Sequence, residues 1–339
     1  MTAISAVKIP AIERYRRLMV ALAKADSLYD VALKLLPILA KLGLALPAAF
    51  LVWRTIHPLK QTSGTYRLLV IEKAVFNIDM LEVLKDTDEV RAFGVKRAII
   101  KALALGILPR SVCGDDTYVS HDPAVAAAKI RYLKLWRKLW YYLYMFGRYD
   151  GVITGNWCYW AEREMATALE EAGTPFIVLH KEGIKPPERS KMLCELFRKT
   201  RGGFTGRRVL VYHEKERDHQ LAADISRLDQ IRIVGMPRLD RIHAWRHEAA
   251  SGCAASRAER PIVLFLAFLP NNFLPSYSGI KSDLAWNELC SGFYQAAVTF
   301  AQCNPGVEVI IRPRGYEISE TAALIPEGEL PTNLKLDSS

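Results

Sequence analysis

Three titratable residues follow directly on an apolar run in the middle of the chain. The stretch FIVLHKEGIKPPERS begins at Phe176, and its apolar residues give way to His180, Lys181 and Glu182. Imidazole and carboxylate groups transfer protons, and burial at the end of a strand tunes their pKa for that task. We therefore expect proton transfer at this place.

Other apolar runs of strand length also end in polar or glycine residues. In open parallel sheets ligands bind beyond the carboxyl ends of the strands, so agreement among several strand ends indicates a site. Any single residue of this kind is more often a helix cap or a solvated loop charge. The residues that we expect to contact substrate in this way, besides Lys181, are Asn156, Glu214, Gly235, Arg238 and Asp240, and Glu72 ends the run LLVIE.

The rhythm of these runs predicts an α/β protein. Helix-length amphipathic stretches separate the apolar runs, one of them Tyr159–Gly173 with Gly173 as its C-cap. This alternation indicates βαβ units and a parallel sheet that is covered on both faces. The runs that we expect to be strands are 66–72, 89–95, 151–155, 176–180, 208–213 and 231–235.

The chain divides at a stretch rich in Ala, Ser and Gly. We expect a helical N-terminal region (1–65), a Rossmann-like domain (66–246), a linker (247–261) and a second Rossmann-like domain (262–339). In the second domain, strands over 262–268 and 307–313 flank a helix around 283–302. Only about eighty residues follow the linker, whereas such domains need on the order of 150. We therefore expect the second domain to be incomplete.

Composition bounds the function more loosely. The 339 residues include 46 Lys and Arg against 36 Asp and Glu, a net charge of +10. Such an excess favours an anionic partner, or it serves solubility alone, and the two explanations carry equal weight. The six cysteines form no CxxC pair, and the N-terminus lacks a signal pattern, so we expect a reducing cytoplasm and neither disulfides nor a metal site.

Two segments bear on membranes. Lysines, prolines and a glycine interrupt the apolar segment 31–53, which predicts an amphipathic or core helix instead of a spanning one. The segment KIRYLKLWRKLWYYLYMF (129–146) interleaves basic and aromatic residues. It fits a helix lying on an anionic bilayer surface, or a helix buried against a sheet with its lysines in solvent, and the second arrangement is the commoner one.

The order of these elements resembles that of a known enzyme family. The junction IRIVGMPRLDRI, followed by a linker and the strand IVLFLAF, resembles the junction of GT-B glycosyltransferases. VLHKEGIKPP and VEVIIRPRG fit the bacterial capsule and surface-polysaccharide branch, which is akin to CDP-glycerol transferases and 3-deoxy-manno-octulosonate transferases. The resemblance extends over about 66–315, and its motifs are short.

The resemblance implies a two-domain transferase that needs no cofactor beyond its nucleotide-activated sugar or polyol donor. The first domain would bind a polysaccharide or lipid-linked acceptor, with Glu182 as general base and His180 and Glu72 behind it. Lys181 would contact an anionic acceptor or the leaving phosphate. The second domain would hold the donor. It implies a cytoplasmic enzyme, peripheral at the inner membrane face. The net positive charge permits nucleic-acid binding, but the sequence contains no recognised nucleic-acid-binding module, so we expect no nucleic-acid partner. The residues implied to bind the donor phosphates are Asn271, Asn272, Arg312 and Arg314.

The chain also departs from the family pattern. Arg314 stands where the family has His, and the chain ends at Ser339 before the helix start and acidic residue that bind the nucleotide in the family. We therefore expect either a fragment or a shortened relative. Two other functions stay open: a nucleotide-sugar epimerase of the same fold, and a truncated, non-catalytic adaptor at the membrane surface in polysaccharide assembly.

Overall fold

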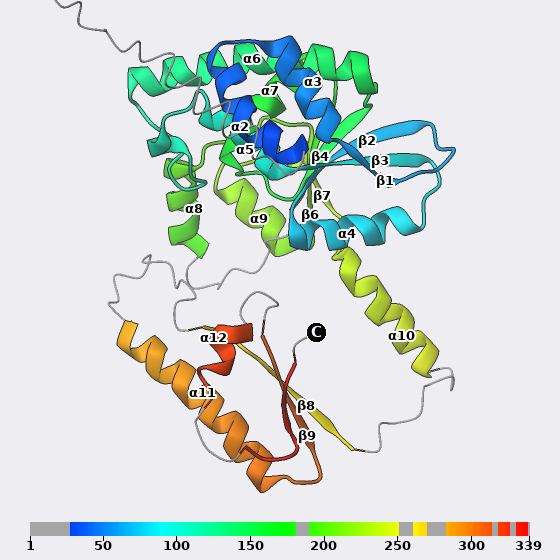
Figure 1. Cartoon of the computed structure of the whole chain (residues 1–339), viewed down its shortest axis with the longest axis vertical. Helices are drawn as coiled ribbons and strands as arrows, with labels where there is room; N and C mark the ends of the chain where they lie inside the picture. The colour runs from blue at the N-terminus through cyan, green and yellow to red at the C-terminus, as the bar shows by residue number, and fades with distance from the viewer. Residues whose placement is uncertain are drawn as a thin grey trace, which may run out of the picture. The chain divides into compact units, whose positions relative to one another are not determined.

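The computed structural model describes residues 28–180, 190–250, 260–269, 283–313, 318–325 and 330–337. The chain divides into two compact units, the first ending at Ala244 and the second beginning at Trp245. Each unit is built around a sheet of its own (Figure 1). The predicted α/β class with parallel sheets is confirmed in both.

The first unit contains a seven-stranded sheet in the order β1-β3-β2-β4-β5-β6-β7. Strands β2 to β7 are parallel, and β1 is an antiparallel edge strand beside β3. The six predicted strands are confirmed to within two residues at each end, whereas β1 was not predicted, because it is short and contains Pro58. The strands are β1 His57–Lys60, β2 Tyr66–Glu72, β3 Val90–Lys96, β4 Gly151–Thr154, β5 Phe176–His180, β6 Arg208–Val211 and β7 Ile231–Ile233.

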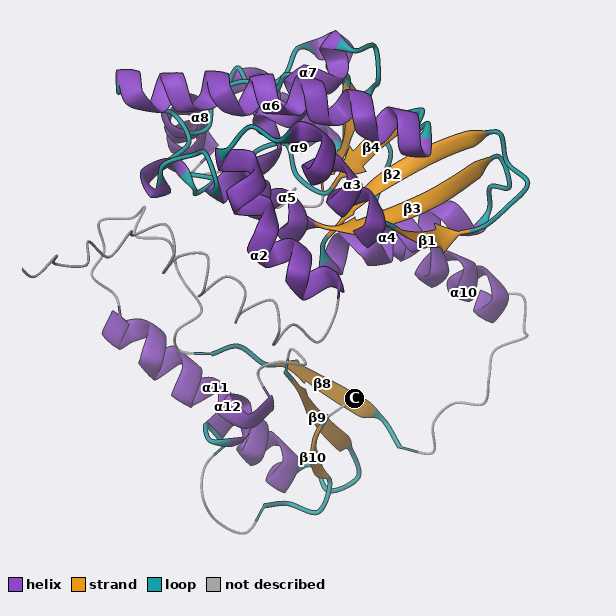
Figure 2. Cartoon of the chain, turned by 45° about the horizontal axis from the view of Figure 1, so that its top comes forward, coloured by secondary structure: helices purple, strands orange, loops and turns teal. Residues whose placement is uncertain are grey.

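Helices cover both faces of this sheet, with α2, α3, α5, α6 and α7 on one side and α4 on the other (Figure 2). The larger apolar cluster lies on the first side. The smaller one lies under α4, through Phe76, Met80 and Leu84. The helices are α2 Leu28–Lys41, α3 Ala45–Thr55, α4 Ala74–Lys85, α5 Arg97–Leu105, α6 Pro123–Gly147, α7 Arg163–Glu171, α8 Ser190–Thr200, α9 Glu214–Ala222 and α10 Asp240–Ala250, with short 3-10 turns η1 Arg110–Val112, η2 Trp160–Glu162, η4 Leu228–Gln230 and η5 Pro237–Leu239.

The two segments examined for membrane contact both form helices. The segment 31–53 forms most of α2 and most of α3, and the turn between them contains Gly43 with a φ of +70°. In α6, Asp122 accepts a hydrogen bond from the amide of Ala124, and Pro123 opens the first turn. Its apolar side packs into the larger apolar cluster, while Arg131, Lys134 and Lys138 are exposed and Lys129 is half-buried. The helix is thus packed against the rest of the first unit, and its exposed basic side is open to solvent or to another surface. Within the described ranges, no helix combines the length and apolar content that crossing a membrane requires.

The second unit contains a parallel three-stranded sheet in the order β10-β9-β8. Helix α11 connects β8 to β9, and Cys290, Tyr294 and Ile311 form the centre of its apolar core. Helix α10 includes His247–Ala250, so the expected linker begins in a helix, and 251–259 lie outside the described residues. The expected domain boundaries and the incompleteness of the second domain stay predictions. The elements are β8 Ile262–Leu266, α11 Asp283–Cys303, β9 Glu308–Arg312, α12 Ile318–Ala322 and β10 Leu334–Leu336.

Candidate functional site

The strand order of the first unit indicates where a ligand would bind. From β2 the chain first adds β3 on one side and then returns to add β4 on the other. Open parallel sheets bind ligands beyond the carboxyl ends of the two strands that flank such a reversal. Here these ends are Glu72 on β2 and Thr154 on β4. A small void of about 10 Å³, lined in part by Asn156, Tyr159 and Glu162, lies near the turn after β4.

Buried polar side chains gather on one face of the sheet at this edge. Thr154 and His180 each lie two residues beyond a valine of the larger apolar cluster, Val152 and Val178, so they point to that same face. They end neighbouring strands, β4 and β5. Each makes a contact with a buried carboxylate. The buried polar residues at this edge are Arg97, Thr154, Glu162, His180 and Glu216.

The His180 imidazole is held by a carboxylate that follows the next strand. Its Nε2 lies 3.1 Å from Oε1 of Glu216, in the first turn of α9, and the two side chains are only 3% and 1% exposed. A carboxylate can only accept, so Nε2 carries the hydrogen. Nδ1 has no hydrogen-bond partner within the described part of the chain. In the neutral ring, this nitrogen keeps a lone pair that can take a proton.

Glu162 occupies the same edge, one strand away. Its Oε1 accepts a hydrogen bond of 2.7 Å from Nε of Arg97, and its Oε2 accepts one of 2.9 Å from the hydroxyl of Thr154. Burial raises the pKa of Glu162 to about 7, against the opposing effect of the Arg97 guanidinium and both hydrogen bonds. A carboxyl group with this pKa can both take and return a proton near neutral pH.

Two cations contact one aromatic ring beside this carboxylate. The guanidinium carbon of Arg97 lies 3.7 Å from the ring centroid of Tyr159, and the ammonium of Lys73 lies 4.8 Å from it. Lys73 comes directly after β2, and Tyr159 is buried in the turn after β4. The place where the strand order reverses therefore has positive charge next to an aromatic face, which suits an anionic substrate.

Glu72 belongs to a different group on the other face of the sheet. It lies two residues beyond Val70, which is part of the smaller cluster. Its Oε2 lies 3.1 Å from Nε2 of His57, and its Oε1 accepts a hydrogen bond from Asn77. Glu72 and His180 were expected to act as one catalytic set, but the structure does not bring them together. The reason is the alternation of side chains along each strand.

Arg238 forms an ion pair with a buried carboxylate. Its Nε lies 2.9 Å from Oδ1 of Asp79, a fully buried residue of α4, and its Nη2 donates to Asp79 Oδ2 and to the Tyr212 hydroxyl. That hydroxyl also donates to Asp79 Oδ2, and the pKa of Tyr212 is raised, first by burial and then by this bond. The junction after β7 is thereby fixed to α4. Arg238 was expected to bind substrate; here its guanidinium pairs with Asp79, and its substrate contact stays a prediction.

Other predicted residues occupy turns and helix ends. Asn156 is buried, and its side-chain oxygen accepts a hydrogen bond from the amide of Cys158, which closes a turn after β4. Gly235 has a φ of +76°, a conformation that glycine adopts without strain. Glu214 and Asp240 are exposed in the first turns of α9 and α10, where carboxylates favour the helix dipole. Their substrate contacts stay predictions.

The remaining predicted residues lie elsewhere. Arg312 ends β9 in the second unit, where its Nε lies 3.3 Å from an oxygen of Asp337. The other five, among them the favoured base, lie outside the described residues, and their roles stay predictions. These five are Lys181, Glu182, Asn271, Asn272 and Arg314.

Sequence reasoning missed Glu216, Arg97 and Glu162. Arg97 could have been found, because it follows directly on the strand VRAFGVK. Glu216 and Glu162 carried no comparable signal, since each lies inside a charged helical stretch that reads as solvated. In the described ranges, no three His, Cys, Asp or Glu side chains gather as they would around a metal ion.

Comparisons with known proteins add little to this geometry. No protein-family model and no curated protein matches the chain. The crystal structure of UDP-GlcNAc 2-epimerase from Neisseria meningitidis bound to UDP-GlcNAc is similar over 81% of this chain and 72% of its own, with a TM-score of 0.46 and 11% identity. The structure of UDP-N-acetylglucosamine 2-epimerase from Rickettsia bellii is similar over 81% of this chain and 68% of its own, with a TM-score of 0.40 and 10% identity. Similarities this weak do not identify a substrate or a reaction for this chain.

Proposed function

We propose that the protein is an enzyme that acts on a nucleotide-activated sugar or polyol and transfers its activated group to an acceptor hydroxyl. The observation that carries this proposal is the buried His180–Glu216 pair at the carboxyl edge of the first sheet. Lys73 and Arg97 at the same edge favour a phosphate-bearing substrate. The surface-polysaccharide or lipid-linked nature of the acceptor rests on the sequence resemblance alone.

Among the residues that the structure describes, His180 is the one that acts as general base in this reaction. Glu216 keeps the hydrogen on Nε2 of His180. Nδ1 takes the proton of the acceptor hydroxyl while the hydroxyl oxygen bonds to the reacting atom of the activated group, the transferred centre. The bond from that centre to the leaving nucleotide phosphate breaks, and the phosphate oxygen takes up the electron pair; the released nucleotide is a diphosphate for an NDP-sugar donor and a monophosphate for a CMP-sugar or CDP-polyol donor. Glu182, outside the described residues, remains the alternative base.

The test separates nucleotide binding from turnover. Thermal-shift measurements with CMP, CDP, UDP and GDP should find one nucleotide that clearly stabilises the full chain. Glu216→Gln should lower kcat of the corresponding transfer about 100-fold or more, because the imidazole loses its orienting charge, with the nucleotide shift preserved. Failure of all four nucleotides to stabilise the chain contradicts the proposal, and so does wild-type turnover by Glu216→Gln.

A second candidate is a nucleotide-sugar epimerase, and the observation that favours it is Glu162. Inverting a carbon centre by proton transfer needs one group that removes a proton and another that returns it, and a carboxyl of pKa about 7 can serve as either one near neutral pH. Incubation with a UDP-sugar in D2O, without acceptor, decides between the two. An epimerase exchanges hydrogen for deuterium at the inverted carbon, and a transferase leaves the sugar unchanged.

A further inference from the structure

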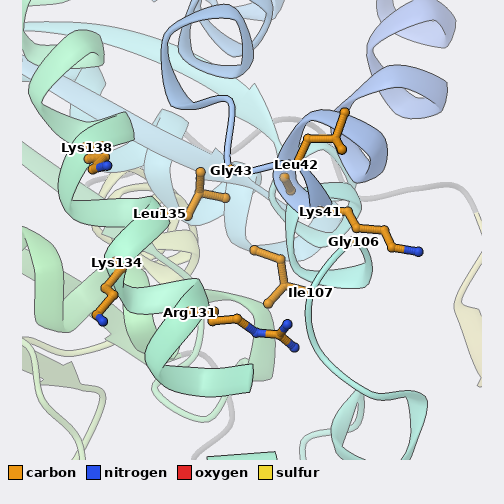
Figure 3. A pocket seen from close by; sticks show the side chains of 10 residues that line it. Lys41, Leu42, Gly43, Gly106, Ile107, Arg131, Lys134, Leu135 and Lys138 are labelled. Atoms are coloured by element: carbon orange, nitrogen blue, oxygen red, sulfur yellow. The ribbon is translucent and has the colours of Figure 1, made fainter. Parts of the chain in front are cut away.

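The outer face of α6 and the turn between α2 and α3 form a basic hollow with an apolar border. The hollow measures about 400 Å³, and Figure 3 shows Arg131, Lys134 and Lys138 on successive turns of α6, with Lys41 across from them. Leu135 and Ile107 lie between the two sides. This site lies away from the carboxyl edge of the sheet, and the proposed reaction does not use it.

The four cations of this hollow are not neutralised within the described part of the chain. No ion pair joins Lys41, Arg131, Lys134 or Lys138 to a carboxylate there, although the neighbouring Arg137 does pair with Glu171. The sequence explains this, because the 25 residues of α6 contain no Asp or Glu. Four positive charges around one hollow favour an anionic group, and phosphate is the one that such side chains bind best.

Exposed apolar side chains continue this surface along α3. Leu46 and Phe50 lie about one turn apart on α3 and are 49% and 51% exposed, and Leu42, in the turn before this helix, is 65% exposed. The ring of Phe50 lies 6.3 Å from that of Phe146 near the end of α6, so the apolar residues of the two helices are contiguous. Met145 adds a further exposed side chain at that end. A contiguous exposed apolar stripe next to a basic hollow is an interaction surface.

This combination of basic and apolar side chains indicates what kind of partner binds the surface. A bilayer presents phosphate groups at its surface and hydrocarbon a few ångströms deeper, and peripheral proteins match the two with basic and apolar residues on one face. We propose that this face, which we call the α3–α6 face, docks on a membrane containing anionic phospholipid. The hollow takes a lipid phosphate, while Leu42, Leu46 and Phe50 enter the outer acyl region. Docking of this kind does not depend on which reaction the protein catalyses.

Co-sedimentation of the full chain with lipid vesicles tests the proposal. The protein should bind vesicles with about one third phosphatidylglycerol at least tenfold more tightly than pure phosphatidylcholine vesicles. The double variant R131E/K134E should lose this preference. The matched control K191E/K199E removes the same charge from exposed positions on α8 and should bind like the wild type. All four positions are exposed, so the variants should keep the wild-type melting temperature.

High salt separates the apolar contribution to vesicle binding from the electrostatic one. In about 0.5 M NaCl, where charge attraction is screened, the variant L42S/F50S should bind anionic vesicles several-fold more weakly than the wild type. Binding that survives R131E/K134E overturns the proposal, as does equal binding to both vesicle types. Light scattering tests the other occupant, a second copy of the chain. A wild-type dimer that L42S/F50S converts to monomer also overturns it.

Discussion

At the scale of single residues, the first unit is distinguished by buried charged groups that are paired across the sheet edge. His180 with Glu216, Arg97 with Glu162, and Arg238 with Asp79 each join residues from different elements. Removing one partner of a buried pair leaves an uncompensated charge, which costs far more than losing a surface pair. These pairs therefore make sharp predictions for stability and for its dependence on pH.

Glu162 should make stability fall as pH rises through neutrality. Its pKa of about 7 in the folded chain lies above the ordinary value of about 4.3, so between these values the folded state holds a proton that the unfolded state has released. This stabilisation is complete below about pH 4 and is lost as pH rises through 7, on the order of 2 kcal/mol between pH 5 and 8. Urea unfolding of wild type and Glu162→Gln at several pH values measures it.

In that comparison, the difference in unfolding free energy between wild type and Glu162→Gln should shrink or reverse sign as pH rises from 5 to 8. Glu171→Gln is the control, because the exposed Glu171 has a pKa lowered by its hydrogen bond with Arg137 and stays ionised throughout this range. A difference for Glu162→Gln that stays constant with pH would contradict a raised pKa.

Arg238→Met should destabilise the first unit strongly. It leaves the fully buried Asp79 without its cation, which costs about 3 kcal/mol. Arg227→Met, which removes an exposed arginine paired with Asp229, should cost less than about 1 kcal/mol. Urea denaturation measures both losses. Equal losses for the two variants would show that removing Arg238 does not leave the Asp79 carboxylate without a compensating charge.

At the scale of elements, the close approach of β4 to α4 shapes the edge where the strand order reverses. A Cβ on Gly155 would lie 2.8 Å from both Cβ and Cγ of Phe76, a fully buried ring in α4. By contrast, a Cβ on Gly151, at the other end of the same strand, would meet its neighbours at an ordinary 3.6 Å. The absence of a side chain at Gly155 thus lets α4 lie against the carboxyl end of β4.

Gly155→Ala should therefore lower the free energy of unfolding by about 1–3 kcal/mol, since Phe76 cannot move without disturbing the core under α4. Gly151→Ala should be tolerated to within about 1 kcal/mol. Thermal unfolding of the two variants measures the difference. If Gly155→Ala unfolds at the wild-type temperature, α4 is less closely packed on the sheet than the structure indicates.

At the scale of the whole molecule, the apolar clusters respect the division into two units. The two clusters that cover the faces of the first sheet contain only residues before Ala244, and the cluster of the second unit contains only residues after Trp245. A unit with a core of its own can fold independently.

A fragment of residues 1–250 should therefore fold without the second unit. It should show a cooperative thermal transition and protease resistance equal to that of the same residues in the full chain, because its sheet and both clusters are complete. Differential scanning calorimetry of fragment and full chain measures this. A fragment that melts without cooperativity would show that the second unit is needed to complete the first.

The sequence alone determined the elements and their class. Apolar runs and amphipathic stretches are local patterns, so β2, β5 and α11 were predicted almost to the residue, and the basic, aromatic character of α6 was evident. The tertiary structure decided which side chains meet. Asp79 and Arg238 stand 159 positions apart, and no local pattern links them. Likewise His180 and Glu72 end similar strands but point to opposite faces, and Glu216 completes the pair from another helix. The physical reason is that periodicity along a chain is set by neighbouring residues, whereas partners across a sheet edge are set by strand order and register.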